Sequence, residues 1–175
     1  MKIDVNKLTY RLLSADMIPM LLDIQEETFL AAKGDTDFLR RNTPETLAPC
    51  FEGDSRVLGA FLGDTPVAFG ILHAAGEGKE NLAFDADPIE RVTDSANVKL
   101  IIVRPDYRGN GIQRLLIKNL EEYAVGMGYL WLCATVAPSN RYSLDNFLAT
   151  GFSEHKLLKK YGGLERVLLI KHIKK

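Results

Sequence analysis

The stretch from residue 98 to 127 constrains the fold more than any other part of the chain. Residues 98–103 form a run rich in β-branched side chains, which favours a buried strand. A turn containing Gly109 and Gly111 follows, and from Ile112 onward apolar residues recur at helical spacing. The sequence therefore predicts a strand, a glycine turn and a helix in direct succession, as in an α/β protein.

The rest of the chain supplies the other elements of one mixed sheet. Further strands are expected at residues 8–13, 56–62, 66–73, 129–136, 152–161 and 164–173. Further helices are expected from Ser14 to Gly34, from Thr43 to Gly53 and from Pro138 to Gly151. A long polar excursion at residues 74–97 interrupts this order, and we expect a short helix within it at residues 88–91. The alternation of strands and helices predicts helices on both faces of the sheet, and residues 1–175 read as a single domain.

Composition excludes several classes of partner. The formal net charge is −1, so no global field attracts nucleic acid or an anionic membrane. No apolar stretch approaches the roughly 20 residues that a membrane-spanning helix needs. Cys50 and Cys133 form neither a zinc-ligand spacing nor a disulfide framework, and we expect Cys133 to be a buried thiol. We therefore expect a cytoplasmic protein without a metal ion.

The glycine turn has the properties of an anion-binding site. The first amides of a helix have no partner inside the helix, and the helix dipole makes that end positive. Glycines let the backbone approach a ligand closely, and Arg108 adds a forked positive donor, with Arg114 one turn later. Two common phosphate motifs do not fit, because the lysine of a P-loop and the third glycine of a dinucleotide fingerprint are both missing. The glycine turn and the helix start instead suit a diphosphate that is bound in a way different from these two motifs.

Two segments resemble a known family. They are Val103-x-Pro105-x-x-Arg108-Gly109-x-Gly111-Ile112 with Leu115-Leu116, and Val136-x-Pro138-x-Asn140-x-x-Ser143-x-x-x-Phe147-x-x-x-Gly151-Phe152. The first segment resembles motif A of the GCN5-related N-acetyltransferases (GNAT). The second segment also resembles that family, as does the spacing between the two segments. The resemblance implies a GNAT-like domain of six to seven mostly antiparallel strands, with a parallel central pair and about four helices on both faces. It also implies direct transfer of an acetyl group from acetyl-CoA to a primary amine.

The resemblance assigns a binding role to particular residues. The loop amides would wrap the pyrophosphate of coenzyme A, and its pantetheine arm would pair with the fourth strand beside a bulge that separates it from the fifth. The amide of Val103 would face the thioester carbonyl, and Asn140 would bind the pantetheine amide. The implied contact residues for acetyl-CoA are Ile101, Ile102, Val103, Arg108, Gly109, Asn110, Gly111, Ile112, Gln113, Arg114, Asn140, Ser143 and Phe147.

The chain departs from the family pattern at two positions. Gln113 stands where many members have glycine or alanine, so binding through its amide requires the side chain to point outward. Phe147 stands where many members have a tyrosine that protonates the leaving thiolate. Tyr142 and Tyr161 are the candidate substitutes. The general base is open among Glu26, Glu27, His73 and water.

The acceptor cannot be read from the sequence. It is a small molecule or a peptide amino group, and one hypothesis is that the excursion attracts a cationic acceptor through Asp85, Asp87, Glu90 and Asp94. Because Phe147 replaces the usual tyrosine, a catalytically silent acyl-CoA-binding module is the alternative function. A nucleotide-binding regulator is a further alternative. The family often forms homodimers, and the resemblance extends that expectation to this chain.

Overall fold

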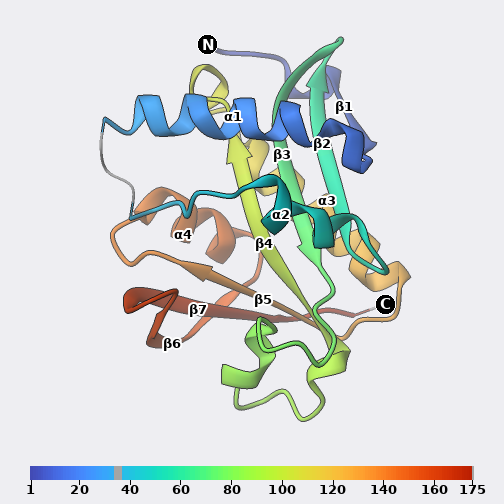
Figure 1. Cartoon of the computed structure of the whole chain (residues 1–175), viewed down its shortest axis with the longest axis vertical. Coiled ribbons are helices and arrows are strands. Elements are labelled where there is room, and N and C mark those ends of the chain that lie inside the picture. The colour runs from blue at the N-terminus through green and yellow to red at the C-terminus, as the bar shows by residue number, and fades with distance from the viewer. Residues whose placement is uncertain (34–36, 175) are drawn as a thin grey trace.

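A computed structural model describes residues 1–33 and 37–174, which contain one seven-stranded mixed sheet flanked by helices (Figure 1). Within these residues the strands are β1 (Leu8–Leu12), β2 (Arg56–Leu62), β3 (Thr65–His73), β4 (Ser95–Val103), β5 (Trp131–Val136), β6 (Ser153–Lys160) and β7 (Leu164–His172). The α-helices there are α1 (Ile18–Ala31), α2 (Pro44–Leu47), α3 (Ile112–Gly126) and α4 (Arg141–Ala149). The predicted order of elements is confirmed.

The sheet has the order β1-β2-β3-β4-β5-β7-β6. Neighbouring strands run antiparallel except β4 and β5, which run parallel at the centre of the sheet. The predicted fold class, with its parallel central pair, is therefore confirmed. The parallel pairing is short, because it joins only Ser95, Ala96 and Asn97 to the first three residues of β5.

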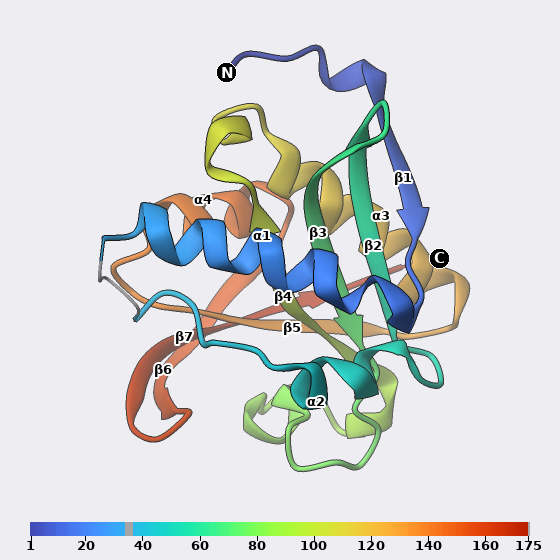
Figure 2. The same cartoon turned by 45° about the horizontal axis from the view of Figure 1, so that its top comes forward.

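Helices cover both faces of the sheet, as expected (Figures 1 and 2). Successive strand residues point to opposite faces, so Phe69 and Ile71 of β3 pack beneath α1 while Ala68 and Leu72 pack beneath α3. Close approach of α3 depends on Gly70, where an added Cβ would lie 3.0 Å from Leu120 Cδ1. The two cores fix α1 and α3 on the strands that border the site.

The excursion between β3 and β4 differs from the prediction. The expected helix at residues 88–91 is absent from the described chain, and short 3₁₀ helices form instead at Leu82–Asp85 and Val92–Asp94. The segment follows its apolar side chains, because Leu82, Ala86 and Ile89 are buried against β5 and β7. β4 also begins three residues earlier than predicted, since its polar residues Ser95 and Asn97 bind the excursion.

Other expectations concern chain ends, thiols and membranes. Helix α1 ends at Ala31, and the expected end at Gly34 lies outside the described residues. Cys50 and Cys133 are buried and free, and burial raises the pKa of the Cys133 thiol to about 12. In the described part of the chain, no helix has the length and apolar character to cross a membrane.

Candidate active site

The site forms where β4 and β5 separate. On β4, Leu100 pairs with Ile71 and Val98 pairs with Leu72, so Lys99 is an extra, bulged residue. A bulge bends its strand, and β5 accordingly leaves β4 after Asn97 to pair with β7 alone. Among the described residues no strand pairs with the β5-facing edge of β4 beyond Asn97. The expected bulge and opening are thus present.

A cleft of about 350 Å³ runs beside this open edge. The N–H of Arg104 donates to the carbonyl of Val67 on β3 (2.9 Å). Neighbouring amides along a strand point to opposite sides, so the N–H of Val103 points away from β3 and toward the cleft. The lining residues are Thr28, Phe29, Ala32, Phe38, Leu39, Ile101, Ile102, Val103, Arg108, Gln113, Asn140, Tyr142 and Ser143.

Helix α3 begins at one end of this cleft without a cap. Gly111 occupies the N-cap position in the left-handed region (φ 76°), and no side chain accepts from the first turn. Across the described residues, the backbone N–H groups of Gly109 to Arg114 donate to no protein acceptor. In α4, by contrast, the Asn140 side chain accepts from Ser143 N. Six unpaired amides at a positive helix end have the chemistry that an anion-binding site requires.

The N-terminal segment contacts this loop, which follows β4 (Figure 1). Lys2 Nζ donates to the carbonyl of Gly109 (3.0 Å). The side chain of Asn110 accepts from Ile3 N (3.2 Å) and donates to the carbonyls of Met1 (2.8 Å) and Tyr107 (2.9 Å). Asn110 therefore offers the cleft only its backbone amide. The sequence did not indicate this contact, because no local pattern links residues more than 100 positions apart.

The side chain of Gln113 does not point outward as the sequence analysis required. It is only 8% exposed, and it lies between α3 and α4. Its Nε2 donates to Ser143 Oγ (2.8 Å), and its Oε1 accepts from Asn146 Nδ2 (2.9 Å). Arg114 Nε donates to Asn146 Oδ1 (2.7 Å), so this guanidinium is held toward α4. The network leaves the Gln113 amide unobstructed, and Asn146 is a supporting residue that the sequence analysis missed.

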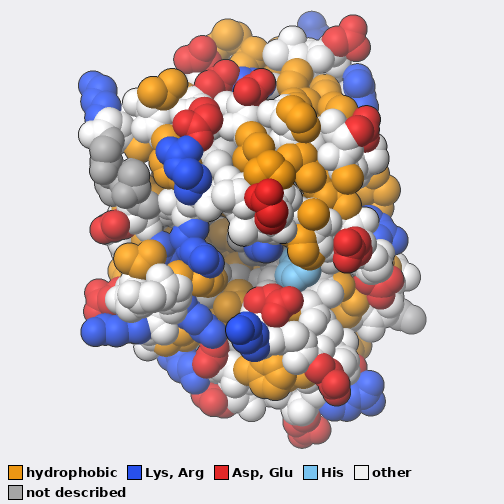
Figure 3. Space-filling model, viewed as in Figure 1, with side chains coloured by type: hydrophobic (Ala, Val, Ile, Leu, Met, Phe, Trp, Pro, Cys, Tyr) orange, Lys and Arg blue, Asp and Glu red, His pale blue; other side chains and the backbone are white. Residues whose placement is uncertain are grey.

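A second cavity of about 180 Å³ lies farther back along β4, at Val98 to Leu100, and shares Phe38 and Leu39 with the cleft. Figure 3 shows this face hollowed near its centre, with Lys and Arg side chains, a histidine and acidic side chains around the hollow. A smaller cavity of about 110 Å³ lies between β4 and β5. It shares Leu39, Lys99 and Leu100 with the second cavity and Ile101 and Asn140 with the cleft, so it connects them. The second cavity is lined by Phe38, Leu39, Arg40, Asn42, His73, Glu80, Leu82, Asn97, Val98, Lys99, Leu100, Thr135, Tyr161 and Arg166.

The aromatic candidates lie at different points along this path. Phe147 lines the connecting cavity and is buried, with its ring edge-on to Phe152 (5.0 Å between centroids). Tyr142 is exposed on the wall of the cleft. Tyr161 lines the second cavity, and its hydroxyl lies 2.9 Å from Thr135 Oγ1 at the opening between the strands.

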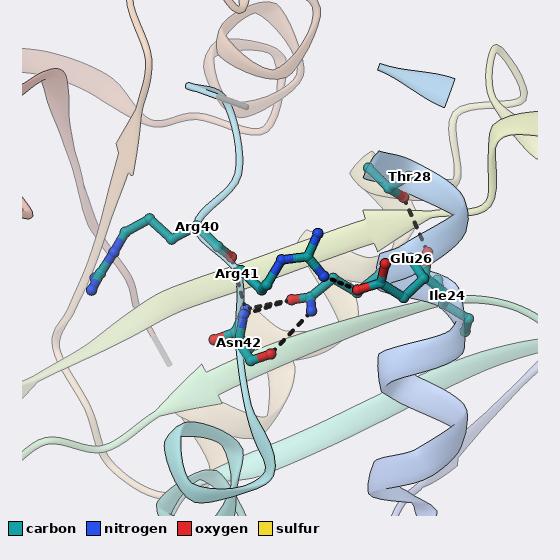
Figure 4. A network of polar contacts seen from close by, with 7 residues as sticks. Ile24, Glu26, Thr28, Arg40, Arg41 and Asn42 are labelled. Carbon is teal, nitrogen blue, oxygen red and sulfur yellow. Dashed lines mark hydrogen bonds and ion pairs between the residues drawn. The ribbon is translucent and has the colours of Figure 1, made fainter. Parts of the chain in front are cut away.

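The candidate bases are also separated. Glu26 forms an ion pair with Arg41 and lines none of the cavities just described, so the structure does not bring it to the site (Figure 4). Glu27 forms an ion pair with Arg104. His73 instead lines the second cavity beside Glu80, which the sequence analysis missed because it lies in the irregular excursion.

His73 is held as a neutral imidazole. Its Nδ1 lies 3.1 Å from Ser55 Oγ and its Nε2 lies 3.5 Å from Glu80 Oε1. Burial, and then the charge of Lys99, lower the pKa of His73 below its ordinary value. The pKa of Glu80 is also lowered, chiefly by a hydrogen bond with its own backbone and further by His73 and Lys99. Near neutral pH the pair is therefore an unprotonated imidazole beside a carboxylate.

One wall of the second cavity is held by a buried glutamine. Gln25 of α1 accepts from Asn42 N (2.8 Å) and donates to Asn42 O (3.1 Å). This pairing fixes the segment that carries Leu39 and Arg40 across the mouth of the cavity. Figure 4 shows the side chain of Arg40 directed away from that of Arg41. Sequence reasoning missed Gln25, since a polar residue on an amphipathic helix is ordinarily exposed.

Comparison with known proteins decides the family. A sequence model of the acetyltransferase (GNAT) family matches residues 18–152. The chain belongs to the GNAT family. Acetyl-CoA-dependent N-acetylation is the general reaction of GNAT proteins. No curated protein sequence matches this GNAT chain.

Solved structures show the same GNAT fold. The ribosomal-protein-S18-alanine N-acetyltransferase of Escherichia coli has a TM-score of 0.71 and 19% identity, over 96% of this chain and 95% of that one. A GCN5-related N-acetyltransferase from Kribbella flavida has a TM-score of 0.73 and 14% identity, over 97% and 100%. The aminoglycoside acetyltransferase AAC(6')-Ib, solved with coenzyme A and kanamycin, has a TM-score of 0.72 and 14% identity, over 94% of each chain.

Proposed function

We propose that this GNAT chain transfers an acetyl group from acetyl-CoA directly to the primary amine of a small molecule or peptide. The observation that carries the proposal is the set of unpaired amides from Gly109 to Arg114 at the end of an open strand edge. These donors fit a diphosphate, and the free edge of β4 fits an extended amide-bearing arm. In the described residues no cluster of His, Cys, Asp or Glu could hold a metal ion, and the proposal needs none.

When bound, acetyl-CoA supplies an activated thioester. The loop amides and Arg108 would bind the diphosphate, and Asn140 Nδ2 would donate to an amide of the arm, since its Oδ1 already accepts from Ser143 N. We assign the N–H of Val103 to the thioester carbonyl oxygen, where a fixed donor stabilises developing negative charge. Gln113, Ser143 and Phe147 form the wall behind the thiol.

Proton movement is assigned to the groups that line the second cavity. His73 is neutral and can accept the proton that the amine loses, with Glu80 beside it to stabilise the imidazolium. The hydroxyl of Tyr161, next to Thr135 at the opening, is the assigned donor to the departing thiolate. We further propose that residues 1–175 form one catalytic domain acting in the cytoplasm, where buried thiols such as Cys133 stay reduced.

The proposal is tested by thiol release from acetyl-CoA in the presence of a panel of primary amines. We expect coenzyme A to stabilise the protein thermally and ATP to have little effect, because only coenzyme A also fills the β4 edge. At least one amine should release thiol and form an N-acetyl product in equal amounts by mass spectrometry. Stabilisation by ATP alone would favour the nucleotide-binding regulator instead.

The second candidate, a silent acyl-CoA-binding module, is favoured by one observation. Phe147 is buried against Phe152 and carries no hydroxyl at the position where many GNAT members have their proton donor. Such a module would bind coenzyme A but release no thiol with any amine. The panel separates it from the enzyme, provided that binding is measured on the same preparation.

Replacing Phe147 with tyrosine tests the role of that position. The new hydroxyl would extend from the wall of the connecting cavity, so we expect the fold to change in stability by less than about 1.5 kcal/mol. Affinity for coenzyme A should be retained, and kcat should be equal to or above that of the native protein because a second donor reaches the thiolate. Calorimetry and steady-state kinetics check both quantities. A large loss of binding would show that the thiol lies elsewhere.

A further inference from the structure

The second cavity carries an excess of positive charge. Among its described lining residues are three cationic side chains, Arg40, Lys99 and Arg166, and one carboxylate, Glu80. His73 adds no charge near neutral pH, because its pKa is lowered. Glu80 lies beside His73 and acts on Lys99, so among the described lining residues the two arginines have no acid of their own.

Arg166 is a buried cation that has no carboxylate partner among the described residues. It is 5% exposed, and its Nη1 and Nη2 donate to the backbone carbonyls of Glu165 and Asp37. In the part of the chain that the structure describes, no carboxylate lies within ion-pair distance of Arg166 or of Arg40. A buried charge is ordinarily paired, so an anion supplied from outside would satisfy this guanidinium.

The two arginines converge on one aromatic ring. The guanidinium carbon of Arg40 lies 4.3 Å from the centroid of Tyr161, and that of Arg166 lies 5.9 Å from the same centroid. The ring attracts each guanidinium but carries no net charge, so these contacts leave both positive charges without a counter-ion. Guanidinium groups bind carboxylate or phosphate through paired hydrogen bonds, so this arrangement is suited to such a group.

The acidic residues of the excursion do not supply a site for a cationic acceptor. Asp85 pairs with Lys160, Asp87 with His155 (2.9 Å), and Asp94 with Arg91 (3.1 Å). None of these carboxylates, nor Glu90, lines the cavity. The hypothesis of a cationic acceptor drawn to the excursion is therefore not supported.

We infer that the acceptor is a small primary amine that also carries an anionic group, which binds between Arg40 and Arg166. This inference rests on the proposed function, because it names the acceptor of that reaction. The ring of Tyr161 lies beside the arginines, and its hydroxyl lies beside Thr135 at the opening of the connecting cavity. An acceptor that reaches both ends of Tyr161 therefore has only a short chain between its amine and its anionic group. The cavity volume of about 180 Å³ is below the range for drug-sized ligands, which agrees with a compact acceptor.

The acceptor class is tested with amines that differ only in the anion. Glycine, β-alanine and γ-aminobutyrate are compared with alkylamines of equal length, and phosphoethanolamine distinguishes a phosphate from a carboxylate. We expect kcat/KM for the best anionic amine to exceed that of its alkylamine by about 30-fold or more, as for a desolvated charge pair. Equal kcat/KM values for the anionic amines and for the alkylamines of equal length would overturn the inference.

The arginines provide a matched pair of variants. We expect Arg40→Gln to raise KM for the best anionic amine about tenfold and to leave the alkylamine unchanged. Arg41→Gln is the control, because Arg41 pairs with Glu26 outside the cavity. Arg166→Gln should have a larger effect, and Arg40→Gln carries the test if that buried variant does not fold. Equal effects of the Arg40 and Arg41 variants on the anionic amine would also overturn the inference.

A binding measurement separates this inference from the proposed function. If no amine releases thiol, the proposed function fails, and the acceptor site is then tested on the protein saturated with coenzyme A. By calorimetry, N-acetyl derivatives of the three amino acids should bind more tightly than the corresponding N-alkylacetamides, and Arg40→Gln should remove the difference. Equal binding of both series would reject the anion site even where turnover is observed.

Discussion

Gly111→Val is expected to weaken binding of coenzyme A by about 100-fold or more, roughly 2.7 kcal/mol, with the fold retained. A Cβ added at Gly111 would meet no protein atom within 4 Å, so the valine side chain would enter the open space that we assign to the diphosphate. The backbone there has φ 76°, which a β-branched residue adopts only under strain. Isothermal calorimetry with coenzyme A measures the affinity, and circular dichroism checks the fold.

Gly128→Val is the matched control for the strain alone. Gly128 also has a positive φ, 87°, and a Cβ there would likewise meet no atom within 4 Å. It follows the C-terminal end of α3, at the opposite end of that helix from the loop amides. We expect both variants to lose about 1–3 kcal/mol of stability but only Gly111→Val to lose affinity. Similar affinity losses in both would reject the loop assignment.

Phe69→Ala is expected to lower the free energy of unfolding by about 3–5 kcal/mol, the largest stability effect that we predict. Phe69 is 1% exposed and packs with Leu21, Ile24 and Ile102 between β3 and α1. Removing the ring leaves a cavity under α1, the helix that borders the cleft. The folded state then loses both the transfer free energy of the buried ring and the packing contacts around the cavity. Urea unfolding followed by tryptophan fluorescence measures the change.

Phe84→Ala is the control for this prediction. Phe84 is 57% exposed in the excursion, so removing its ring should change the free energy of unfolding by less than about 0.5 kcal/mol. A change below about 1 kcal/mol for Phe69→Ala would show that the sheet and α1 are not packed as described. Saturating coenzyme A should raise the stability of both variants, because a ligand that binds only the folded state stabilises it.

The sequence was sufficient for the fold and for the glycine loop that precedes α3. The β-branched run before Gly109 and the helical spacing after Ile112 are local patterns, and local patterns specify strands, turns and helices directly. The family resemblance added the bulge of β4 and the separation from β5. The excursion was less predictable, because its course is set by Leu82 and Ile89 packing against strands that are distant in sequence.

The acceptor side could not be predicted for the same reason. Arg40, Glu80 and Arg166 come from three irregular or terminal parts of the chain, and only the folded sheet brings them to one cavity. Gln25 has no distinguishing neighbour in the sequence, and its role depends on a contact with Asn42, which lies 17 positions later. Glu26 was a candidate because the first helix borders the acceptor pocket in the family, but its carboxylate pairs with Arg41 instead.

The short ladder between β4 and β5 has a consequence for how the molecule responds to its cofactor. Among the described residues, strand pairing between the four-stranded half-sheet β1–β4 and the three-stranded half-sheet of β5, β7 and β6 is limited to residues 95–97 of β4. A pantetheine arm lying along β4 would occupy the position of a missing strand and brace the two halves against each other. In such an arrangement the cosubstrate would also be a structural component, doing the work of a strand that the sheet lacks at its centre.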